Sequence, residues 1–279
     1  MKPAPFTYHR PQTVNEAVAM LAALAPVGGR VLAGGQSLVP LMAFRLAQPA
    51  HLIDINRVDF GSLRVEDGVL RIPATVRHAE LERSPVPLVA EVARHIAHVP
   101  IRQRGTLCGS LAHADPASEW CLVLAALDGE VLAKSARGER VIAARDFFKG
   151  IMTTALADDE LLVEARLPLL PPDTRCGFYE FNRRAGDFAL AMALGAYRLD
   201  GGKMIAPRLA VGAAEVNPRR ITEAERALDG AAPGDAAFRA AAKAATAAID
   251  PMEDIINTAE FRRDLVLAVT RRALERAAG

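Results

Sequence analysis

Two short glycine-bearing segments carry the residue types best suited to bind a phosphate. The first is Leu32-Ala33-Gly34-Gly35-Gln36-Ser37, where a short apolar run leads into adjacent glycines and then into a helical pattern. Unpaired N–H groups and the helix dipole attract phosphate at such a point, and glycine lets the backbone approach a pyrophosphate closely. The segment matches neither GxGxxG nor a Walker loop. A simple turn before a helix is therefore the alternative interpretation.

The second segment is Thr106-Leu107-Cys108-Gly109-Ser110, which follows two arginines and precedes Asp115 and Glu119. Its hydroxyl groups and its glycine would add donors for a diphosphate, and a downstream acid would accept hydrogen bonds from ribose hydroxyls. The alternative is that the two arginines only pair with surface carboxylates. No histidine is set near Cys108 in the pattern of a cysteine hydrolase, so we interpret Cys108 as a small loop residue.

The remaining polar residues do not indicate metal ligation or acid–base catalysis. The six histidines show no H-E-x-x-H spacing, and the three cysteines show no paired-ligand spacing. We therefore expect no metal site and no catalytic side chain in this chain. Arg183-Arg184-Ala185-Gly186-Asp187-Phe188 has two interpretations: a polar bend with ion pairs, or a loop that places Phe188 against the aromatic ring of a cofactor.

The overall charge excludes several classes of partner. Lys and Arg total 34, Asp and Glu total 33, and the formal net charge is +1, which gives no general attraction to nucleic acid or to an anionic membrane. Charged or polar residues interrupt every candidate membrane span, and residues 1–6 lack the apolar core of a secretory signal. With 51% hydrophobic residues, the chain is expected to be a globular cytoplasmic protein.

The elements expected in the N-terminal half alternate between helix and strand, which favours an α/β layer at its start. Thr13 and Glu16 have the spacing of a capping box that opens a helix over Val14–Leu24. The pattern then predicts a strand over Arg30–Ala33, a helix over Leu38–Leu46, a strand over His51–Ile55, a hairpin over Leu63–Pro73, helices over His78–Leu81, Leu88–His95 and Ser118–Leu127, an ordered loop over Arg102–Ser110, and strands over Val131–Lys134, Arg140–Ile142 and Leu161–Leu167.

A proline-rich stretch, Leu167–Asp173, is the best candidate for a linker between two domains. We expect a first domain over residues 1–170, with subdomains of about 1–55 and 56–170, and a second domain over 175–279. The second is expected to contain strands over Phe178–Asn182, Ala189–Leu199 and Lys203–Ala213, a turn at Asp200-Gly201-Gly202, and helices over Pro218–Leu228, Ala236–Ile249 and Ala259–Ala277. The alanine-rich helix over Ala236–Ile249 is apolar on several sides, so it should pack against neighbours or a partner.

Taken together, these segments resemble a known family. The two glycine segments, in this order and with their flanks, are similar to the FAD pyrophosphate-binding signatures of the medium, flavin-carrying subunit of molybdenum hydroxylases, the carbon monoxide dehydrogenase and xanthine dehydrogenase family. The resemblance extends to Phe6–Pro11, Pro40–Met42, Ala112–Pro116 and Arg183–Ala189 and so covers nearly the whole chain.

The resemblance implies an α+β fold. Its first part would be a two-subdomain FAD-binding domain of the PCMH or vanillyl-alcohol-oxidase type, and its second a small C-terminal domain of an antiparallel sheet plus helices. The first two segments would wrap the FAD diphosphate, an acid at Asp115 or Glu119 would face the adenosine, Leu162 would pack near adenine or ribose, and Phe188 would shield the isoalloxazine ring. The residues expected to bind FAD are Leu32, Ala33, Gly34, Gly35, Gln36, Ser37, Leu38, Thr106, Leu107, Cys108, Gly109, Ser110, Asp115, Glu119, Leu162 and Phe188.

Three positions depart from the family pattern. Cys108 replaces the commoner glycine, Ser110 replaces a frequent asparagine, and Tyr179 stands where xanthine dehydrogenases place a lysine directed at the flavin. A cysteine is tolerated at position 108 if its φ is negative, whereas a positive φ would cost strain.

The implied function is electron transfer rather than substrate chemistry. A large subunit would hold the molybdopterin cofactor, a small subunit would hold two [2Fe–2S] clusters, and the FAD on this chain would pass electrons to an external acceptor, in a complex expected to be a dimer of heterotrimers. Two alternatives are a stand-alone FAD-dependent oxidase and a structural bridging subunit with an empty flavin site.

Overall fold

The chain begins with a small parallel sheet covered by one helix. The computed structural model describes residues 2–279, and its first helix, α1 (Val14–Leu24), has the predicted bounds. The Thr13 hydroxyl accepts from the Glu16 amide (3.2 Å), while the Glu16 carboxylate accepts from the Gln12 amide (2.7 Å), so both ends of the capping pair are used. The sheet has the order β1 (Thr7–His9), β3 (His51–Asp54), β2 (Gly29–Leu32), and the chain also forms the short 3-10 helix η1 (Ala25–Val27) and helix α2 (Leu38–Ala43).

The second part of the N-terminal half is built on a five-stranded antiparallel sheet. Its strand order is β4 (Arg64–Glu66), β5 (Val69–Pro73), β10 (Leu161–Pro168), β6 (Glu130–Ser135), β7 (Gly138–Ala143). The predicted hairpin is confirmed, because Asp67 (φ 51°) and Gly68 (φ 72°) both adopt the left-handed conformation that a tight two-residue hairpin turn requires. The other elements here are α3 (His78–Leu81), α4 (Pro87–His95), α5 (Val99–Arg102), α6 (Leu107–His113), α7 (Glu119–Ala126), α8 (Ala144–Phe147), β8 (Phe148–Gly150) and β9 (Thr153–Thr154).

The prediction of an ordered loop over Arg102–Ser110 is confirmed only for residues 103–106, because α5 ends at Arg102 and α6 begins at Leu107. Pro100 lies in the first turn of α5, and Thr106 is the N-cap of α6, where its hydroxyl accepts from the Gly109 amide (3.0 Å). Leu107 and Leu111 are both buried and lie four residues apart on α6. Glycine has a low helix propensity, so Gly109 weakens the helical pattern in the sequence. The N-cap and the buried leucines stabilise the helix in the folded chain.

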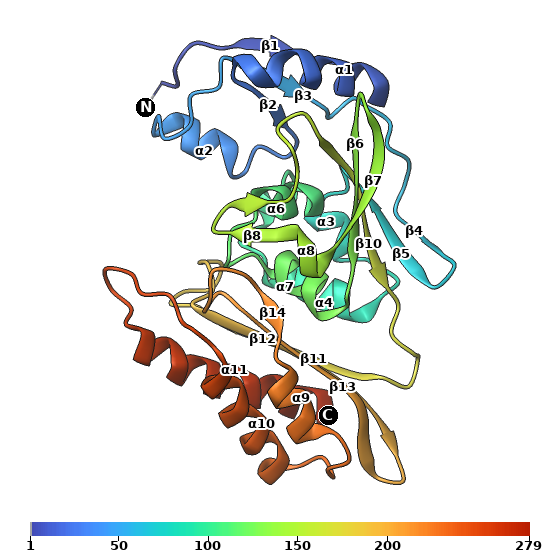
Figure 1. Ribbon diagram of the computed structural model, residues 1–279, viewed down its shortest axis with the longest axis vertical. Coiled ribbons are helices and arrows are strands. Elements are labelled where there is room, and N and C mark those ends of the chain that lie inside the picture. The colour runs from blue at the N-terminus through green and yellow to red at the C-terminus, as the bar shows by residue number, and fades with distance from the viewer. Residues whose placement is uncertain (1) are drawn as a thin grey trace.

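The C-terminal domain is a four-stranded antiparallel sheet covered on one face by helices. The strands run in the order β11 (Arg175–Phe181), β12 (Ala191–Asp200), β13 (Lys203–Gly212), β14 (Arg219–Arg220). Figure 1 shows α9 (Thr222–Leu228), α10 (Asp235–Ala248) and α11 (Ala259–Ala278) lying together against this sheet. Ala241, Ala242 and Ala245 of α10 are buried among these helices, which confirms the prediction that this alanine-rich helix packs against neighbours.

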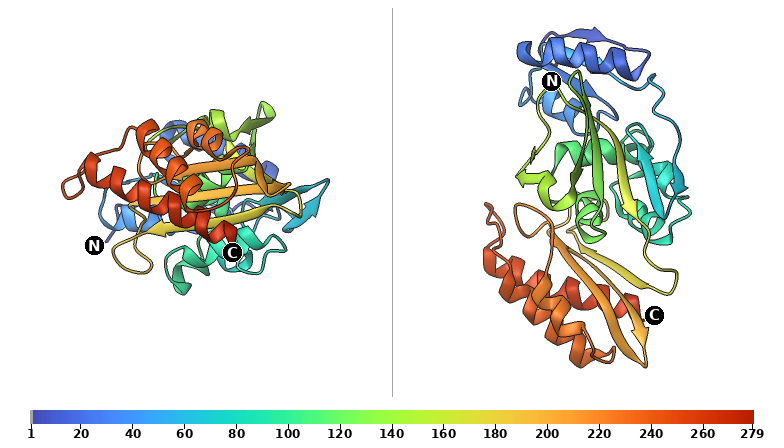
Figure 2. Two further views of the ribbon diagram at one scale, coloured as in Figure 1. Left: turned by 90° about the horizontal axis from the view of Figure 1, so that it is seen from below. Right: turned by 45° about the vertical axis from the view of Figure 1, so that its right-hand side comes forward.

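One of three hydrophobic clusters spans the boundary between the two domains, while each domain also has a cluster of its own. Phe178 and Leu194 of the C-terminal sheet lie in the same buried cluster as Trp120 and Leu122 of α7. Figure 2 shows the domains stacked along the long axis of the molecule, with the α+β architecture that was expected from the sequence. No helix in residues 2–279 is both long and apolar enough to cross a membrane.

Candidate functional site

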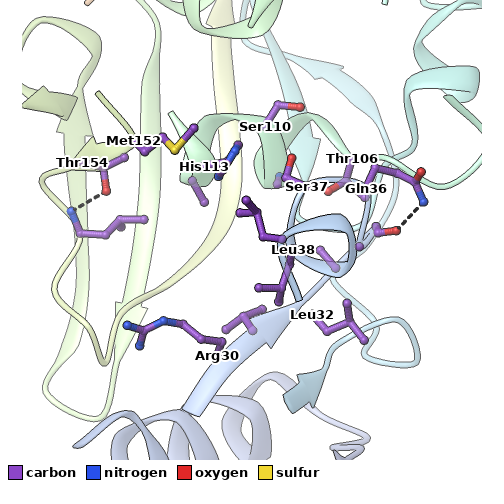
Figure 3. A pocket seen from close by; sticks show the side chains of 18 of the residues that line it. Arg30, Leu32, Gln36, Ser37, Leu38, Thr106, Ser110, His113, Met152 and Thr154 are labelled. Atoms are coloured by element: carbon purple, nitrogen blue, oxygen red, sulfur yellow. Dashed lines mark hydrogen bonds between the residues drawn. The ribbon is translucent and has the colours of Figure 1, made fainter. Parts of the chain in front are cut away.

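A cleft of about 530 Å³ lies between the N-terminal parallel sheet and the rest of the molecule. Its walls are the turn from β2 into α2, the start of α6, and the chain that follows β9 (Figure 3). A volume of this size is typical of small-molecule sites. From the residues predicted to bind FAD, the structure brings to the cleft Leu32, Ala33, Gly34, Gly35, Gln36, Ser37, Leu38, Thr106, Gly109 and Ser110.

The two predicted segments meet at a backbone-to-backbone contact. We call residues 32–38 the first glycine segment and residues 104–110 the second. A Cβ on Gly34 would lie 2.3 Å from the carbonyl oxygen of Arg104 and 2.7 Å from the Cα of Gly105, which is closer than any side chain allows. Glycine at position 34 is therefore required for the two segments to come together, although about 70 residues separate them in sequence.

The first glycine segment presents unused backbone donors. Within residues 2–279, the amides of Gly34, Gly35, Gln36 and Ser37 donate to no acceptor. Gly35 takes a left-handed φ of 75°, and the Gln36 side chain donates to the Gly34 carbonyl (3.3 Å), which holds the turn. Successive free N–H groups at a glycine turn form a concave anion-binding surface.

The second glycine segment contributes in a different way. The amides of Gly109 and Ser110 are already bonded to the Thr106 hydroxyl and carbonyl (3.0 Å each), so these two amides are not free donors. The side chains of Thr106 and Ser110 line the cleft (Figure 3). This segment therefore offers hydroxyl groups and a close backbone surface, while the first offers the amides.

The side chains of Asn56 and Arg77, which lie outside the cleft, connect the two segments. The Asn56 amide group donates to the Ala33 carbonyl (2.8 Å) and its oxygen accepts from Arg77, whose guanidinium also donates to the Arg104 carbonyl. Asp54 accepts from Asn56 (2.5 Å) and from the Tyr8 hydroxyl. The Tyr8 bond helps to hold the pKa of the Asp54 carboxyl below its usual range, against the opposing effect of burial.

The far wall of the cleft was not predicted from the sequence. It contains Asp158 and Glu160, and Arg30 of β2 also lines the cleft. Arg140 holds the Glu160 carboxylate through two bonds (2.6 and 2.7 Å), and these bonds keep the pKa of Glu160 below its usual range. The missed signal is the run of three acids, Asp158-Asp159-Glu160, that directly precedes the apolar run of β10; only Leu162 of this stretch was expected at the site.

Six of the predicted residues lie outside the cleft. Leu107 and Cys108 are 1% and 3% exposed and face the core, and Leu162 of β10 is also buried there. Asp115 accepts from the Ala117 amide (2.9 Å), Glu119 begins α7, and Phe188 is 70% exposed on the turn before β12.

The structure shows the surroundings of two residues that depart from the family pattern, Cys108 and Tyr179. Cys108 has an ordinary helical φ, since it is not among the residues with positive φ, so its side chain causes no backbone strain. Its thiol donates to the Ile72 carbonyl (3.4 Å) inside the core. The guanidinium groups of Arg272 and Arg276 of α11 lie 5.0 and 4.7 Å from the ring centre of Tyr179, and Tyr179 does not line the cleft.

Arg102, one of the two arginines before the second segment, also has a structural role. It donates to the Glu82 carboxylate (2.5 Å) and to the carbonyls of Ile96 and Ala97. Arg102 therefore pairs with groups of the protein, in agreement with the alternative interpretation that the two arginines pair with carboxylates. In residues 2–279, no group of three or more histidine, cysteine or acidic side chains is arranged to hold a metal ion.

Comparison with known proteins agrees with this geometry. The family described as "FAD binding domain in molybdopterin dehydrogenase" matches residues 4–170, and that described as "CO dehydrogenase flavoprotein C-terminal domain" matches residues 177–277. The nicotine 6-hydroxylase medium subunit of Paenarthrobacter nicotinovorans is 38% identical over 281 residues, 98% of each chain.

Two solved structures are similar over the whole chain. The carbon monoxide dehydrogenase of Hydrogenophaga pseudoflava matches with a TM-score of 0.95 and 36% identity, covering 100% of this chain and 99% of that one. The quinoline 2-oxidoreductase of Pseudomonas putida 86 matches with the same TM-score and identity, covering 100% and 98%. This chain therefore belongs to the FAD-binding medium-subunit family of the molybdenum hydroxylases, as an oxidoreductase subunit.

Proposed function

We propose that this chain is the FAD-carrying electron-transfer subunit of a heterotrimeric molybdenum hydroxylase. It would accept electrons from [2Fe–2S] clusters on a small partner subunit and pass them from FAD to an external acceptor. The observation that carries the proposal is the meeting of two distant glycine segments at one cleft, with free amides on one segment and hydroxyls on the other.

The residues of this chain fit the diphosphate of FAD. The four free amides from Gly34 to Ser37 would donate to its oxygens, and the hydroxyls of Thr106 and Ser110 would add donors from the opposite wall. Leu32, Ala33 and Leu38 supply the apolar surface beside the turn. The bound flavin supplies reversible uptake of electrons, while the protein orients it and controls its exposure.

The six predicted residues outside the cleft fall into two groups, which have different roles in this proposal. Leu107, Cys108 and Leu162 would act by packing beneath the site, since their side chains are buried. Asp115, Glu119 and Phe188 stay predicted contacts of the adenosine or of the isoalloxazine ring. For the adenosine, the structure also offers Asp158 and Glu160, which line the cleft directly.

The partners follow from the relatives. The similar proteins include chains named as a medium subunit of nicotine 6-hydroxylase and as subunit beta of caffeine dehydrogenase, and these names imply larger assemblies. We propose a large molybdenum-cofactor subunit and a small iron–sulfur subunit as partners, assembled as a dimer of heterotrimers in the cytoplasm. The organic substrate would bind to the large subunit.

The test is purification of the native complex. We expect three kinds of subunit by mass spectrometry and one FAD for each copy of this chain, visible as flavin absorbance. A colourless complex would favour the structural bridging subunit. Flavin that stays with the chain after acid denaturation would favour a stand-alone oxidase with a covalent flavin, whereas the proposed subunit releases its FAD.

A further inference from the structure

His78 is a buried imidazole that sits directly against the second glycine segment. It is 3% exposed and lines the cleft. Its backbone amide donates to the Gly105 carbonyl (3.0 Å), and its Nε2 atom would lie 2.6 Å from a Cβ on Gly105. The ring therefore occupies the space that a side chain at position 105 would fill, next to the point where the two segments meet.

The hydrogen bond on the other side of the ring determines its tautomer. The Trp120 Nε1–H group lies 3.0 Å from the Nδ1 atom of His78. An indole N–H can only donate, so Nδ1 must accept and carries no proton. If the ring is neutral, its single proton is on Nε2. Within residues 2–279, Nε2 donates to no acceptor.

The surroundings keep the ring neutral. Burial, followed by the charges of Arg77 and Arg102, lowers the pKa of His78 to about 4. Glu80 is the other charged residue of α3, and Glu82, the C-cap of this helix, is paired with Arg102; α7 contributes the uncharged indole of Trp120. Near neutral pH the ring is thus a neutral donor with a free N–H group.

We propose that His78 binds the FAD diphosphate through its Nε2–H group, as a neutral hydrogen-bond donor whose tautomer is set by Trp120. This inference rests on the proposed flavin site. It adds a side chain from a third part of the chain to the two glycine segments. The Nε2 atom has no partner within residues 2–279 and is not among the fully buried unpartnered side-chain atoms, so it keeps some accessible surface and can receive an acceptor from outside the chain.

The test compares variants that separate the donor from the packing. Trp120→Phe removes the indole donor and keeps the imidazole. The double variant His78→Phe/Trp120→Phe removes both partners and leaves neither one unsatisfied. We expect the double variant of the full chain to bind FAD about ten- to a hundredfold more weakly than Trp120→Phe, because a hydrogen bond to a charged group is lost.

The readout is FAD affinity of the flavin-depleted full chain, measured by quenching of flavin fluorescence, together with its melting temperature without FAD. Equal affinities of the double variant and Trp120→Phe would overturn the proposal. If the double variant does not fold, His78→Gln and His78→Met replace it. We expect Gln, which keeps an N–H group, to bind FAD within about threefold of the wild-type chain, and Met to lose affinity; equal affinity of the two would overturn the proposal.

The pH profile supplies a second criterion. A neutral donor predicts wild-type FAD affinity that does not depend on His78 between pH 5.5 and 8. An imidazolium paired with phosphate predicts a fall in affinity with rising pH that is absent in His78→Gln, and this result would also overturn the proposal. A wild-type chain that binds no FAD at all would instead refute the proposed function, so the two failures are distinguishable.

Discussion

Asn56 and Arg77 are hydrogen-bonded to each other, and each also binds a main-chain carbonyl of a different glycine segment. Asn56 holds Ala33 of the first segment, and Arg77 holds Arg104 of the second. This pair lies outside the cleft but fixes the spacing of its two walls. The arrangement makes the bridge a positioning element for the proposed flavin site rather than part of it.

Removing one member of this bridge is expected to weaken FAD binding moderately. Asn56→Ala should reduce FAD affinity about threefold to tenfold, since it removes the neutral hydrogen bond to the Ala33 carbonyl that fixes the first segment. The measurement is fluorescence titration of the flavin-depleted chain. Asn217→Ala, which changes an asparagine of the C-terminal domain, is the control and should bind FAD normally. An unchanged affinity in Asn56→Ala would show that the bridge does not position the segment.

Gly34→Ala is expected to abolish FAD binding. The added Cβ would lie 2.3 Å from the Arg104 carbonyl oxygen, so the two segments must move apart. We expect FAD affinity to fall at least about a hundredfold and the melting temperature to drop. Gly150→Ala is the matched control, because a Cβ at Gly150 meets nothing within 4 Å and its backbone is not left-handed. Normal flavin content in Gly34→Ala would contradict the close contact between the segments.

Glu119 is expected to make stability depend on pH. Burial, reinforced by the carboxylates of Glu180 and Asp115, raises the pKa of Glu119 to about 8 from an ordinary 4.5. Between these values the folded chain holds a proton that the unfolded chain releases, so this group's contribution to stability is full below about pH 4.5 and is lost as pH rises through 8.

The measurement is denaturant unfolding of the wild-type chain and Glu119→Gln from pH 4.5 to 9. The variant lacks the titrating group and should gain relative stability with rising pH, by at least about 1 kcal/mol at pH 8, which is less than the free energy of one pKa unit. Parallel stability curves for the two proteins would rule out a raised pKa at this position.

Cys108 is expected to be structural and unreactive. Burial raises the pKa of its thiol far above the usual range, and the side chain faces Ile72 in the core. Cys108→Ala should therefore bind FAD as the wild-type chain does, with a stability lower by about 1 kcal/mol. Alkylation of the native chain at pH 8, followed by peptide mass spectrometry, should leave Cys108 unmodified. Rapid native alkylation at this residue would contradict the assignment.

Local signals in the sequence predicted much of the fold. The cap at Thr13, the left-handed turn at Asp67-Gly68 and the long apolar run of β12 each have a local cause, and each appears close to where it was expected. Helix α6 was missed because Gly109 weakens its local pattern, and its cap and buried face decide the outcome.

Only those parts of the candidate site that are formed by a single stretch of sequence could be predicted. The first glycine segment carries its own signature, whereas the bridge of Asn56 and Arg77 depends on the pairing of β2 with β3, which brings Asn56 beside Ala33, 23 residues earlier in the sequence. Asp158 and Glu160 reach the cleft only because β10 lies in the middle of its sheet and its preceding turn crosses the cleft wall. Such long-range relationships are not encoded in any single stretch of sequence.

The hydrophobic cluster that spans the two domains determines how the chain behaves after proteolysis. Phe178 and Leu194 are buried against α7, and Asp128 joins Arg208 (2.8 Å) and Arg220 (2.6 Å) across the same boundary. A protease that nicks the proline-rich connection at residues 168–174 would sever the polypeptide without freeing either piece. The nicked protein should elute at its original size, and flavin exchange would proceed through local opening of the cleft rather than through separation of the halves.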